Sequence, residues 1–401
     1  MNNQSTQVST ISNQVIRLPS KLQNFILQPD LKTPFLVIDL EKVVVNYQEL
    51  TRNLPIAKCF YSVKSNPSPN VLKILLAQGS NFECASLGEI QLCLSLGVEA
   101  KNIHFGNTIK SIDSIKKAYA LGIRSFALDC EEELQKIHIH APSSRIVCRI
   151  STTGEGATWG LCNKFGCSVN QAIELLSNAK SLDIDSLGLS FHVGSQQRSS
   201  RAWKVALLDT KTAIDQLALK NIDVELINLG GGFPASGYLN DQNVPVNYDV
   251  AGYAQDVCEY IRQIFGLDNQ YEFMCEPGRF LLSEAGCIKT QVILATHKMV
   301  KRKSQKWLYL DVGKFNGLYE GTDIKHPVYY ANELSDELVE TTLAGPSCDS
   351  DDMLSFKNDL HMLPKLLKTG DHIIFMCTGA YSNSYVSVGF NGIPPLKEYY
   401  I

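Results

Sequence analysis

Short apolar segments alternate with helical patterns from about residue 55 to residue 285. The eight segments are Ala57–Val63, Asn81–Cys84, Ile103–Phe105, Ser125–Asp129, Ile146–Ile150, Leu187–Val193, Glu225–Leu229 and Tyr271–Cys275. Strands separated by helices pair in parallel, and eight strand–helix units close into a (β/α)8 barrel. The repeat therefore predicts an α/β fold built on a TIM-like barrel, in preference to an open, doubly wound sheet.

The intervening segments have the periodicity of amphipathic helices. Apolar residues recur every three or four positions in Pro69–Gln78, Leu87–Leu96 and Ser111–Leu121. Gly97 and Gly122 follow the second and third of these segments, and glycine is common just past a helix end. Each expected strand is thus followed by an element that can cover the outside of a barrel.

After about residue 285 short β-rich runs follow one another without regular helices between them. They are Ile288–Ala295, Trp307–Val312, Val339–Leu343 and His372–Met376. This pattern predicts a mainly antiparallel β domain, and Pro34–Asp39 is a further strand candidate for it. We expect a flexible, polar N-terminal tail over residues 1–20, a barrel over 40–285, and a β domain from 21–39 and 286–401.

Composition excludes several classes of protein. Lys+Arg 37 against Asp+Glu 41 gives a net charge of -4, which speaks against nucleic acid or an anionic membrane as a partner. The apolar runs are too short to span a bilayer. The 12 cysteines form no CxxC pair, so we expect no metal site. With no secretory signal, reduced thiols and a cytoplasmic location are expected.

Polar or reactive residues stand at the end of almost every expected strand, which is where a barrel assembles its active site. They are Lys64, Glu83, His104, Asp129, Arg149, His192, Gly230 and Glu276. Lys64 is the most informative of them. Burial lowers the pKa of a lysine, and a neutral amine can form a Schiff base with an aldehyde. Taken alone, Lys64 is equally explained by a side chain whose stem crosses the strand end and whose head reaches water.

Two further strand ends suggest a site for a phosphorylated ring. The backbone N–H groups of Gly230, Gly231 and Gly232 are free to approach an anion, although a glycine run alone is more often a tight turn. Glu276 could hold a proton on a heteroaromatic nitrogen, and Arg279 could pair with a phosphate. A simpler explanation of Glu276 and Arg279 is an ordinary ion pair at a turn.

Three more candidates have simpler explanations when taken alone. His192 is at the end of the sixth strand, where a single histidine is more often a satisfied core residue. Cys348 follows a Gly-Pro-Ser turn and could act as an acid or base if its pKa is tuned, but its acidic surroundings also suit a solvated loop. Tyr381 presents a hydroxyl after a late strand.

In combination, the motifs resemble those of the fold-type III pyridoxal-phosphate decarboxylases, the ornithine/diaminopimelate/arginine decarboxylase family with its alanine racemase-like barrel. The resemblance runs in consistent order from about Pro34 to Pro395. The matching segments are Tyr61–Asn66, Phe82–Ser86 with Glu89, Phe191–Gln196, Gly230–Phe233, Glu276–Arg279, Gly345–Asp349, Gly379–Tyr381 and Phe390–Gly392.

The resemblance implies pyridoxal 5'-phosphate as cofactor and gives each matching residue a role. Lys64 would carry the cofactor as a Schiff base, His192 would stack on its ring, and Glu276 would pair with the ring nitrogen. Arg149 and Glu83 would support the site near the ring, where the family usually has aspartate in place of Glu83. The phosphate contacts would be Ser195, Gly230, Gly231, Gly232, Arg279 and Tyr381. Tyr381 would also contact the substrate.

The resemblance also implies a homodimer with shared active sites. Cys348 of one chain would return a proton to the substrate bound at Lys64 of the other, and Asp349 would bind the distal amine of the substrate. Lys164 and Asp352 match an ion pair between subunits.

The sequence indicates a class of substrates and does not single out one amino acid. Asp349 favours a basic amino acid, because diaminopimelate enzymes typically have glutamate there. Ornithine enzymes usually present a second substrate aspartate where this chain offers Glu320, so lysine and arginine remain open beside the favoured ornithine. A diaminopimelate or carboxylated-polyamine decarboxylase also stays open, as does a non-catalytic decoy homologue. A racemase is less well supported, because Cys348-Asp349 would have no purpose in it.

Overall fold

The computed structural model describes the chain apart from residues 1–9, 12–13, 16–17, 161–163, 331–336 and 355–359. The chain divides into two compact units. The barrel unit comprises Val44–Pro234 and Tyr248–Phe280, and the β unit comprises Met1–Val43, Ala235–Asn247 and Leu281–Ile401. Residues 235–247, which the sequence suggested for the barrel, therefore belong to the β unit.

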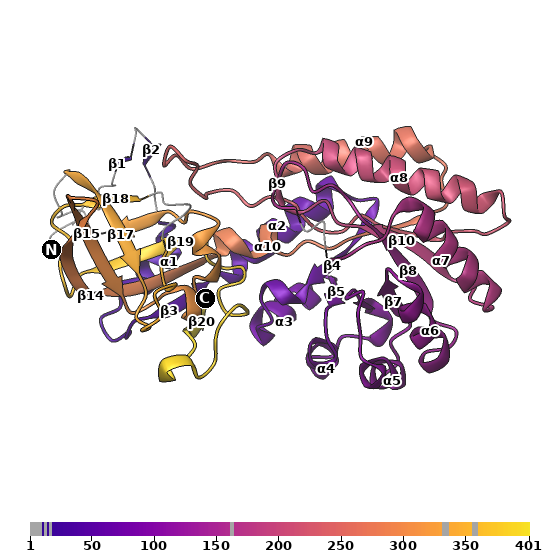
Figure 1. Cartoon of the computed structure of the whole chain (residues 1–401), viewed down its shortest axis with the longest axis horizontal. Coiled ribbons are helices and arrows are strands. Elements are labelled where there is room, and N and C mark those ends of the chain that lie inside the picture. Colours follow the sequence, from indigo (N-terminus) through magenta and orange to yellow (C-terminus); the bar gives the residue numbers. More distant parts are fainter. Residues whose placement is uncertain (1–9, 12–13, 16–17, 161–163, 331–336, 355–359) are drawn as a thin grey trace. The chain divides into compact units, whose positions relative to one another are not determined.

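The strands of the barrel unit close into a barrel in which every pair of neighbours is parallel (Figure 1). In chain order they are β4 (Ala57–Ser62), β5 (Asn81–Cys84), β6 (Ile103–Phe105), β7 (Ser125–Leu128), β8 (Arg145–Ile150), β10 (Leu187–Phe191), β12 (Leu226–Asn228) and β13 (Glu272–Cys275). The eight expected strands are these eight; the bounds of β5 and β6 are as expected, and those of the others differ by one or two residues. The predicted (β/α)8 barrel is confirmed.

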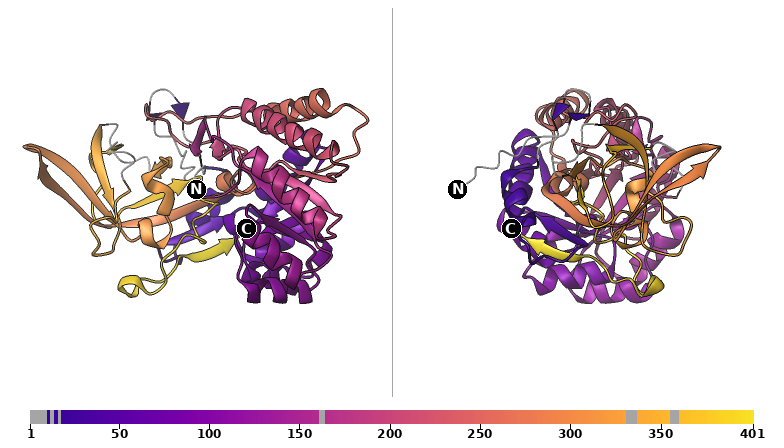
Figure 2. Two further views of the ribbon diagram at one scale, coloured as in Figure 1. Left: turned by 45° about the vertical axis from the view of Figure 1, so that its right-hand side comes forward. Right: turned by 90° about the vertical axis from the view of Figure 1, so that its left-hand side faces the viewer.

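Helices cover the outside of this barrel (Figures 1 and 2). They are α2 (Leu40–Asn53), α3 (Pro69–Ala77), α4 (Leu87–Ser95), α5 (Ile112–Ala120), α6 (Glu131–His140), α7 (Val169–Ser181), α8 (Arg201–Ala218) and α9 (Val250–Phe265). A serine hydroxyl accepts a backbone N–H at the N-terminus of four of them, namely Ser68, Ser86, Ser111 and Ser168. Such caps satisfy donors that the helix itself leaves unpaired, each worth about 1 kcal/mol.

Large apolar side chains fill the space between barrel strands and helices. Phe82, Phe105 and Phe126 on adjacent strands are fully buried, and each contributes about 1.5–3 kcal/mol through burial. Trp203 on α8 stacks on Phe233, with ring centroids 5.0 Å apart. The contact between Trp203 and Phe233 packs α8 against the residue that follows the glycine run Gly230–Gly232. Helix packing therefore helps to fix a loop that forms part of the site described below.

The β unit contains a mixed sheet in which antiparallel pairs predominate. Its strand order is β16 (Val328–Tyr330), β19 (His372–Met376), β14 (Gly286–Val300), β15 (Lys303–Leu310), β17 (Leu338–Ala344) and β18 (His361–Pro364). Two pairs are parallel, β15 with β17 and β3 (Phe35–Ile38) with β20 (Lys397–Tyr400). The expected early strand is β3, which pairs antiparallel with β14.

The expected flexible tail over residues 1–20 lies largely outside the described residues. Its described parts include β1 (Thr10–Ile11) and β2 (Gln14–Val15), which pair with each other. Leu18 is buried and packs in one apolar cluster with residues of α1 (Ser20–Ile26) and β3. At least the end of the tail therefore belongs to the folded β unit, because an apolar side chain there finds a core.

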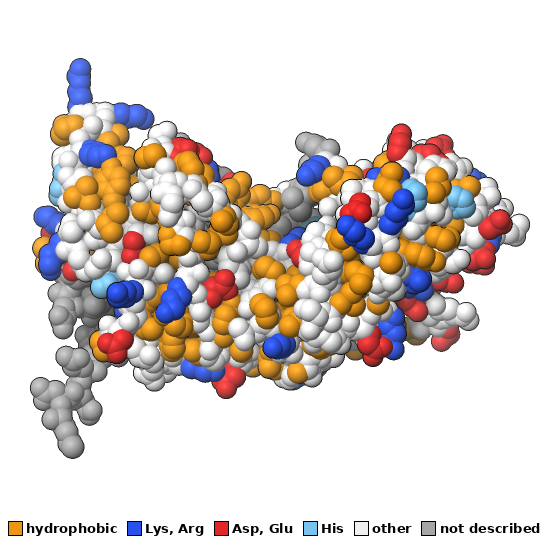
Figure 3. Space-filling model, turned by 90° about the horizontal axis from the view of Figure 1, so that it is seen from below, with side chains coloured by type: hydrophobic (Ala, Val, Ile, Leu, Met, Phe, Trp, Pro, Cys, Tyr) orange, Lys and Arg blue, Asp and Glu red, His pale blue; other side chains and the backbone are white. Residues whose placement is uncertain are grey.

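Several properties of the described residues bear on function. None of their helices combines the length and apolar character that a membrane span needs. Within the same ranges no three His, Cys, Asp or Glu side chains gather as metal ligands. The described cysteines are free thiols. On the face shown in Figure 3, basic and acidic side chains are interspersed among apolar ones.

Candidate active site

The turn that carries Lys64 is held by hydroxyl groups. β4 ends at Ser62, and Lys64 lies in the 3-10 turn η1 (Val63–Ser65). The Ser65 hydroxyl lies 2.9 Å from the Ser62 carbonyl oxygen and 3.0 Å from the Tyr61 hydroxyl. Tyr61 is fully buried. The turn is therefore anchored in the barrel core, so the backbone at Lys64 is fixed while the side chain extends from the strand end.

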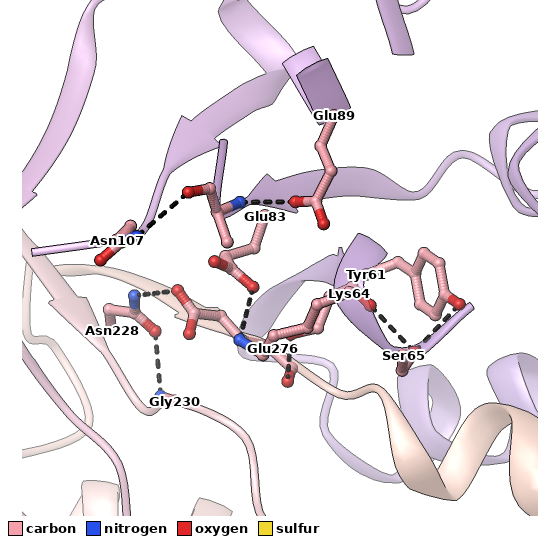
Figure 4. A network of polar contacts seen from close by, with 11 residues as sticks. Tyr61, Lys64, Ser65, Glu83, Glu89, Asn107, Asn228, Gly230 and Glu276 are labelled. Carbon is pink, nitrogen blue, oxygen red and sulfur yellow. Dashed lines mark hydrogen bonds and ion pairs between the residues drawn. The ribbon is translucent and has the colours of Figure 1, made fainter. Parts of the chain in front are cut away.

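Lys64 and Glu83 form the central ion pair of the site (Figure 4). Lys64 Nζ lies 3.0 Å from Glu83 Oε2. The Glu83 side chain is 3% exposed, whereas that of Lys64 is 42% exposed, so the lysine is less enclosed than its strand-end position suggested. Burial alone would raise the pKa of Glu83, but the charge and hydrogen bond of Lys64 hold the pKa below its ordinary value.

The next strand shapes the space around Glu83. A Cβ atom on Gly106 would approach Glu83 Oε1 to 2.5 Å, so this position has room only for glycine. His104 lies opposite Glu83 in the β5–β6 register. Burial lowers the pKa of His104 to about 4, and its Nδ1 lies 2.8 Å from Ser125 Oγ. A neutral imidazole therefore lies beside the Glu83 carboxylate.

Glu276 follows β13 and is the second carboxylate of the site (Figure 4). Asn228 Nδ2 donates to Glu276 Oε1 at 2.6 Å, and the Ser62 hydroxyl donates to the Glu276 carbonyl oxygen at 3.1 Å. Burial and the negative charge of Glu83 raise the pKa of Glu276 to about 7, against the opposing effects of Lys64 and Asn228. Glu276 can therefore exchange a proton near neutral pH.

The glycine run after β12 is forced by close backbone packing. A Cβ on Gly230 would lie 2.1 Å from the Phe191 carbonyl oxygen, and one on Gly231 would lie 2.5 Å from the Glu276 carbonyl oxygen. Gly232 has φ +105, and a Cβ there would lie 2.4 Å from the Gly194 carbonyl oxygen. The run is thus a turn pressed against the ends of β10 and β13, and the absence of side chains leaves its backbone open to a ligand.

His192 follows β10 and has one ring nitrogen occupied. The Gly194 N–H donates to His192 Nδ1 at 3.0 Å. Burial, together with the positive charges of Arg149 and Lys64, holds the pKa of His192 well below its ordinary value. The imidazole is therefore neutral, with Nδ1 as an acceptor and the proton on Nε2.

Arg279 and Ser195 come together beside the glycine run. Arg279 Nε donates to Ser195 Oγ at 3.3 Å, and the guanidinium lies 4.6 Å from the centre of the Trp159 ring. Arg279 is 5% exposed. Ser195 begins β11 (Ser195–Gln197), which pairs antiparallel with β9 (Ala157–Trp159). A hydroxyl and a buried cation are thereby held together, a combination suited to an anion.

Arg149 is in β8, on the strand next to β10. Burial lowers its pKa, and the carboxylates of Glu276, Glu83 and Asp129 act in the opposite direction. Asp129 Oδ2 accepts the Gly166 N–H at 2.8 Å. Arg149 therefore contributes positive charge to the same end of the barrel as the two carboxylates.

The remaining candidates belong to the β unit and are arranged differently. Cys348 and Asp349 are exposed, on the loop after β17. The Cys348 N–H donates to Asn391 Oδ1 at 2.9 Å, so the Gly345–Asp349 and Phe390–Gly392 motifs are in contact. Asp352 is buried and accepts N–H groups of Lys314 and Ser347 at 2.8 and 3.0 Å. Its carboxylate thus organises the loop within this chain.

Glu320 and Tyr381 also lie in the β unit. Glu320 is half-buried in the short turn η5 (Tyr319–Thr322). Tyr381 has φ +63, and its ring centroid is 5.3 Å from that of Tyr385. Both assignments to the site, as substrate contact and as phosphate contact, stay predictions.

Sequence reasoning missed three contributors in the barrel unit. Asn228 is a polar residue inside an otherwise apolar strand, a signal that could have been noticed. Gly106 and Trp159 gave no such signal, because a single glycine or tryptophan has many structural explanations. Their roles depend on which strand ends become neighbours, which only the closed barrel determines.

Comparisons with known proteins agree with this arrangement. The family model described as "Pyridoxal-dependent decarboxylase, pyridoxal binding domain" matches residues 40–283. The chain is 32% identical over 361 residues to the lysine/ornithine decarboxylase of Selenomonas ruminantium, covering 90% of this chain and 87% of that protein.

Two further likenesses cover almost the whole chain. Antizyme inhibitor 2 of Xenopus laevis is 30% identical over 395 residues, covering 96% of this chain and 84% of that protein. The crystal structure of the arginine decarboxylase of Paramecium bursaria Chlorella virus, bound to agmatine, has a TM-score of 0.84 at 28% identity. It covers 95% of this chain and 100% of that chain.

Proposed function

Because the chain belongs to the pyridoxal-dependent decarboxylase family, we propose that it removes the α-carboxyl group of a basic amino acid, with L-ornithine as first candidate. The products would then be putrescine and CO2. The observation that carries the proposal is the polar network of Lys64, Glu83 and Glu276 at the carboxyl ends of the barrel strands. It combines an amine with two carboxylates whose pKa values are shifted in opposite directions.

The residues present fit pyridoxal phosphate. The glycine run, which a single Cβ would fill, together with Ser195 and Arg279, offers the N–H groups of Gly231 and Gly232, a hydroxyl and a guanidinium for the phosphate. The Gly230 N–H, expected from the sequence to be a further donor, instead donates to Asn228 Oδ1. Glu276 offers a carboxylate for the ring nitrogen, and Lys64 offers the amine for the aldehyde. Tyr381 would be a further phosphate contact.

Pyridoxal phosphate, when bound, supplies an electron-poor ring that accepts the electron pair left behind as CO2 departs. The chain's own residues prepare that step. Lys64 would hold the cofactor and then give way to the amino group of the substrate. The Glu276 carboxylate would hold a proton on the ring nitrogen. The neutral imidazole of His192 could pack on the ring without adding a competing positive charge.

A second half-site would come from a partner subunit, so the functional unit would be a homodimer. Cys348 would return a proton to the α carbon after CO2 has left, and Asp349 would bind the distal amine of the substrate. Support comes from the exposure of both residues on a loop whose backbone is held by Asp352 and Asn391. A proton donor and a carboxylate that can bind an amine are both exposed, which suits a site that is completed by another chain.

Ornithine is favoured over lysine and arginine by the resemblance of the HVGS and Phe390–Gly392 motifs. Asp349 supports a basic distal group, because its carboxylate can pair with an ammonium group. Glu320, in the place of a second aspartate, is the feature that leaves chain length open.

The proposal is tested by measuring CO2 release from ornithine, lysine, arginine and diaminopimelate with the loaded enzyme. We expect the highest kcat/KM with ornithine and none above background with diaminopimelate. Turnover of arginine with ornithine inert would reject ornithine and keep a basic amino acid decarboxylase.

The shared site is tested with hybrid dimers. Lys64→Ala and Cys348→Ala chains, each inactive alone, should recover up to about a quarter of the activity when mixed, because random exchange leaves one intact site in half of the dimers. Tagged subunits recovered by tandem affinity steps would prove exchange. Exchange without recovery would contradict the shared site.

Antizyme inhibitor 2 among the relatives makes a non-catalytic protein the alternative function. Retention of Lys64, His192, Glu276, Arg279, Cys348 and Asp349 argues against it. Borohydride reduction of the purified protein followed by peptide mass analysis separates the two. A cofactor adduct on Lys64 supports the enzyme, and its absence after incubation with pyridoxal phosphate supports the alternative.

A further inference from the structure

We propose that Asn228 is the positioning residue that links the two ends of the cofactor site, the carboxylate for the ring nitrogen and the cradle for the phosphate. Asn228 is the last residue of β12 and is 2% exposed. Its side chain lies between Glu276 and Gly230 (Figure 4). The inference rests on the proposed cofactor chemistry and adds a residue to it.

The two contacts use both ends of one amide. Asn228 Oδ1 accepts the Gly230 N–H at 2.9 Å, and Nδ2 donates to Glu276 Oε1 at 2.6 Å. A backbone N–H can only donate, so the contact with Gly230 fixes which end of the amide is oxygen. The N–H end is then necessarily the one that faces the Glu276 carboxylate.

A third hydrogen bond completes a closed network among Asn228, Gly230 and Glu276. The Glu276 N–H donates to the Gly230 carbonyl oxygen at 2.8 Å. Gly230 thus gives its N–H to Asn228 and receives the N–H of Glu276, while Asn228 holds the Glu276 carboxylate. A displacement of the carboxylate or of the glycine turn would break one of these bonds, so the positions of the two are coupled.

The chemistry at each end explains why an amide suits this position. Glu276 must be anionic to hold a proton on the ring nitrogen, and a hydrogen bond from Asn228 favours that charged form against the effect of burial. At the other end the Gly230 N–H is tied back by Oδ1, which keeps the turn in its φ +64 conformation. Leucine, of similar size, would leave a buried carboxylate oxygen and a buried N–H unpaired.

The experiment uses apo-protein and two separate probes, inorganic phosphate for the cradle and pyridoxal, which has no phosphate, for the ring end. Dissociation constants are measured by calorimetry and by the absorbance of bound pyridoxal. We expect Asn228→Leu to weaken both probes by about tenfold or more, because each end loses a hydrogen bond.

A second variant separates the two contacts. Asn228→Asp keeps an acceptor for the Gly230 N–H, so phosphate affinity should stay within about threefold of wild type. Its carboxyl group can donate to Glu276 only while the pair shares a proton. Pyridoxal affinity should therefore fall steeply between pH 6 and about pH 8.5, more than in the wild type, because two adjacent carboxylates repel each other.

The matched control is Asn81→Leu. Asn81 starts β5, at the other end of the barrel strands, and donates to the Cys59 carbonyl oxygen at 3.3 Å. The Asn81→Leu variant loses a comparable hydrogen bond but should keep the wild-type affinities for phosphate and for pyridoxal. Equal loss in this control, or unchanged affinities in folded Asn228→Asp at every pH, would overturn the inference. Failure of the wild type to bind pyridoxal phosphate would instead count against the proposed function.

Discussion

The two units carry their candidate residues in opposite ways. In the barrel unit Lys64, Glu83 and Glu276 are joined by contacts between strand ends, and both carboxylates have shifted pKa values. In the β unit Cys348 and Asp349 are exposed on a loop, and Cys348 is held through its backbone N–H. One set is preorganised within the chain, and the other is presented outward.

The difference indicates that the two units contribute different functions to the site. A polar network that is buried and hydrogen-bonded can bind and tune a cofactor before any substrate arrives. Exposed groups on a well-anchored loop would be enclosed only where the loop packs against another surface. Variants in the barrel unit should therefore change cofactor binding, whereas variants of Cys348 or Asp349 on the exposed loop should change turnover or substrate affinity.

Lys64→Ala is expected to have the largest effect. Turnover should fall by more than about a thousandfold, because the amine that holds the cofactor is lost and no neighbouring group replaces it. Borohydride reduction and peptide mass analysis should find no cofactor on the 61–66 segment. The matched control is Lys58→Ala in β4, whose exposed side chain lies near the N-terminal end of that strand, away from the end that precedes Lys64, and whose loss should leave the adduct intact.

Cys348→Ala should lower kcat by about 10²–10⁴-fold, the range for loss of a general acid. The dissociation constant of pyridoxal phosphate should not change, since Cys348 is not among the proposed cofactor contacts. Ser350→Ala, two residues further along the same exposed loop, is the control and should retain full activity. If the Cys348→Ala enzyme lost cofactor in proportion to its loss of activity, the exposed loop would also contribute to cofactor binding. The proposed difference between the two units would then be wrong.

The fold was predictable because its signals are local and repeated. Each barrel strand is a short apolar run, and each is bounded by a helix start or a turn, so every run could be identified by itself. Boundaries were less predictable where packing decides them. Leu18 belongs to the β-unit core although the residues before it are polar.

The site was predictable only as a set of strand ends. The position of Lys64, Glu83, His192 and Glu276 at strand ends follows from barrel topology, but their pairing does not. That Glu83 contacts Lys64, or that Asn228 contacts Glu276, depends on side-chain direction and on a few ångströms of register. Gly106 illustrates the limit, because the need for glycine arises from a carboxylate on the neighbouring strand, far away in the sequence.

Glu320→Asp is expected to have an intermediate effect, on specificity and not on cofactor binding. Removing one methylene should withdraw the carboxylate and make room for a longer chain, so the kcat/KM ratio of lysine to ornithine should rise about tenfold. Competition between the two substrates in one assay measures the ratio directly. The control is Asp323→Asn, just after the same turn, which should leave the ratio alone. An unchanged ratio in Glu320→Asp would show that Glu320 does not contact the substrate.

The smallest effect expected is on the stability of the apo-protein, and it tests the preorganised network itself. The pKa of Glu276 is raised from 4.5 to about 7 in the folded chain, so the folded state binds more protons than the unfolded state between these values. Wild-type stability therefore falls, through this group, as pH rises across that window, and the loss is complete above about pH 7. Glu276→Gln removes the titration. Its melting temperature relative to wild type should rise by a few degrees from pH 5 to pH 8. Titrating groups away from the site are common to both proteins and cancel in the difference. A difference independent of pH would mean that Glu276 is solvated like an exposed carboxylate, and the barrel unit would then be no more preorganised than the loop that carries Cys348.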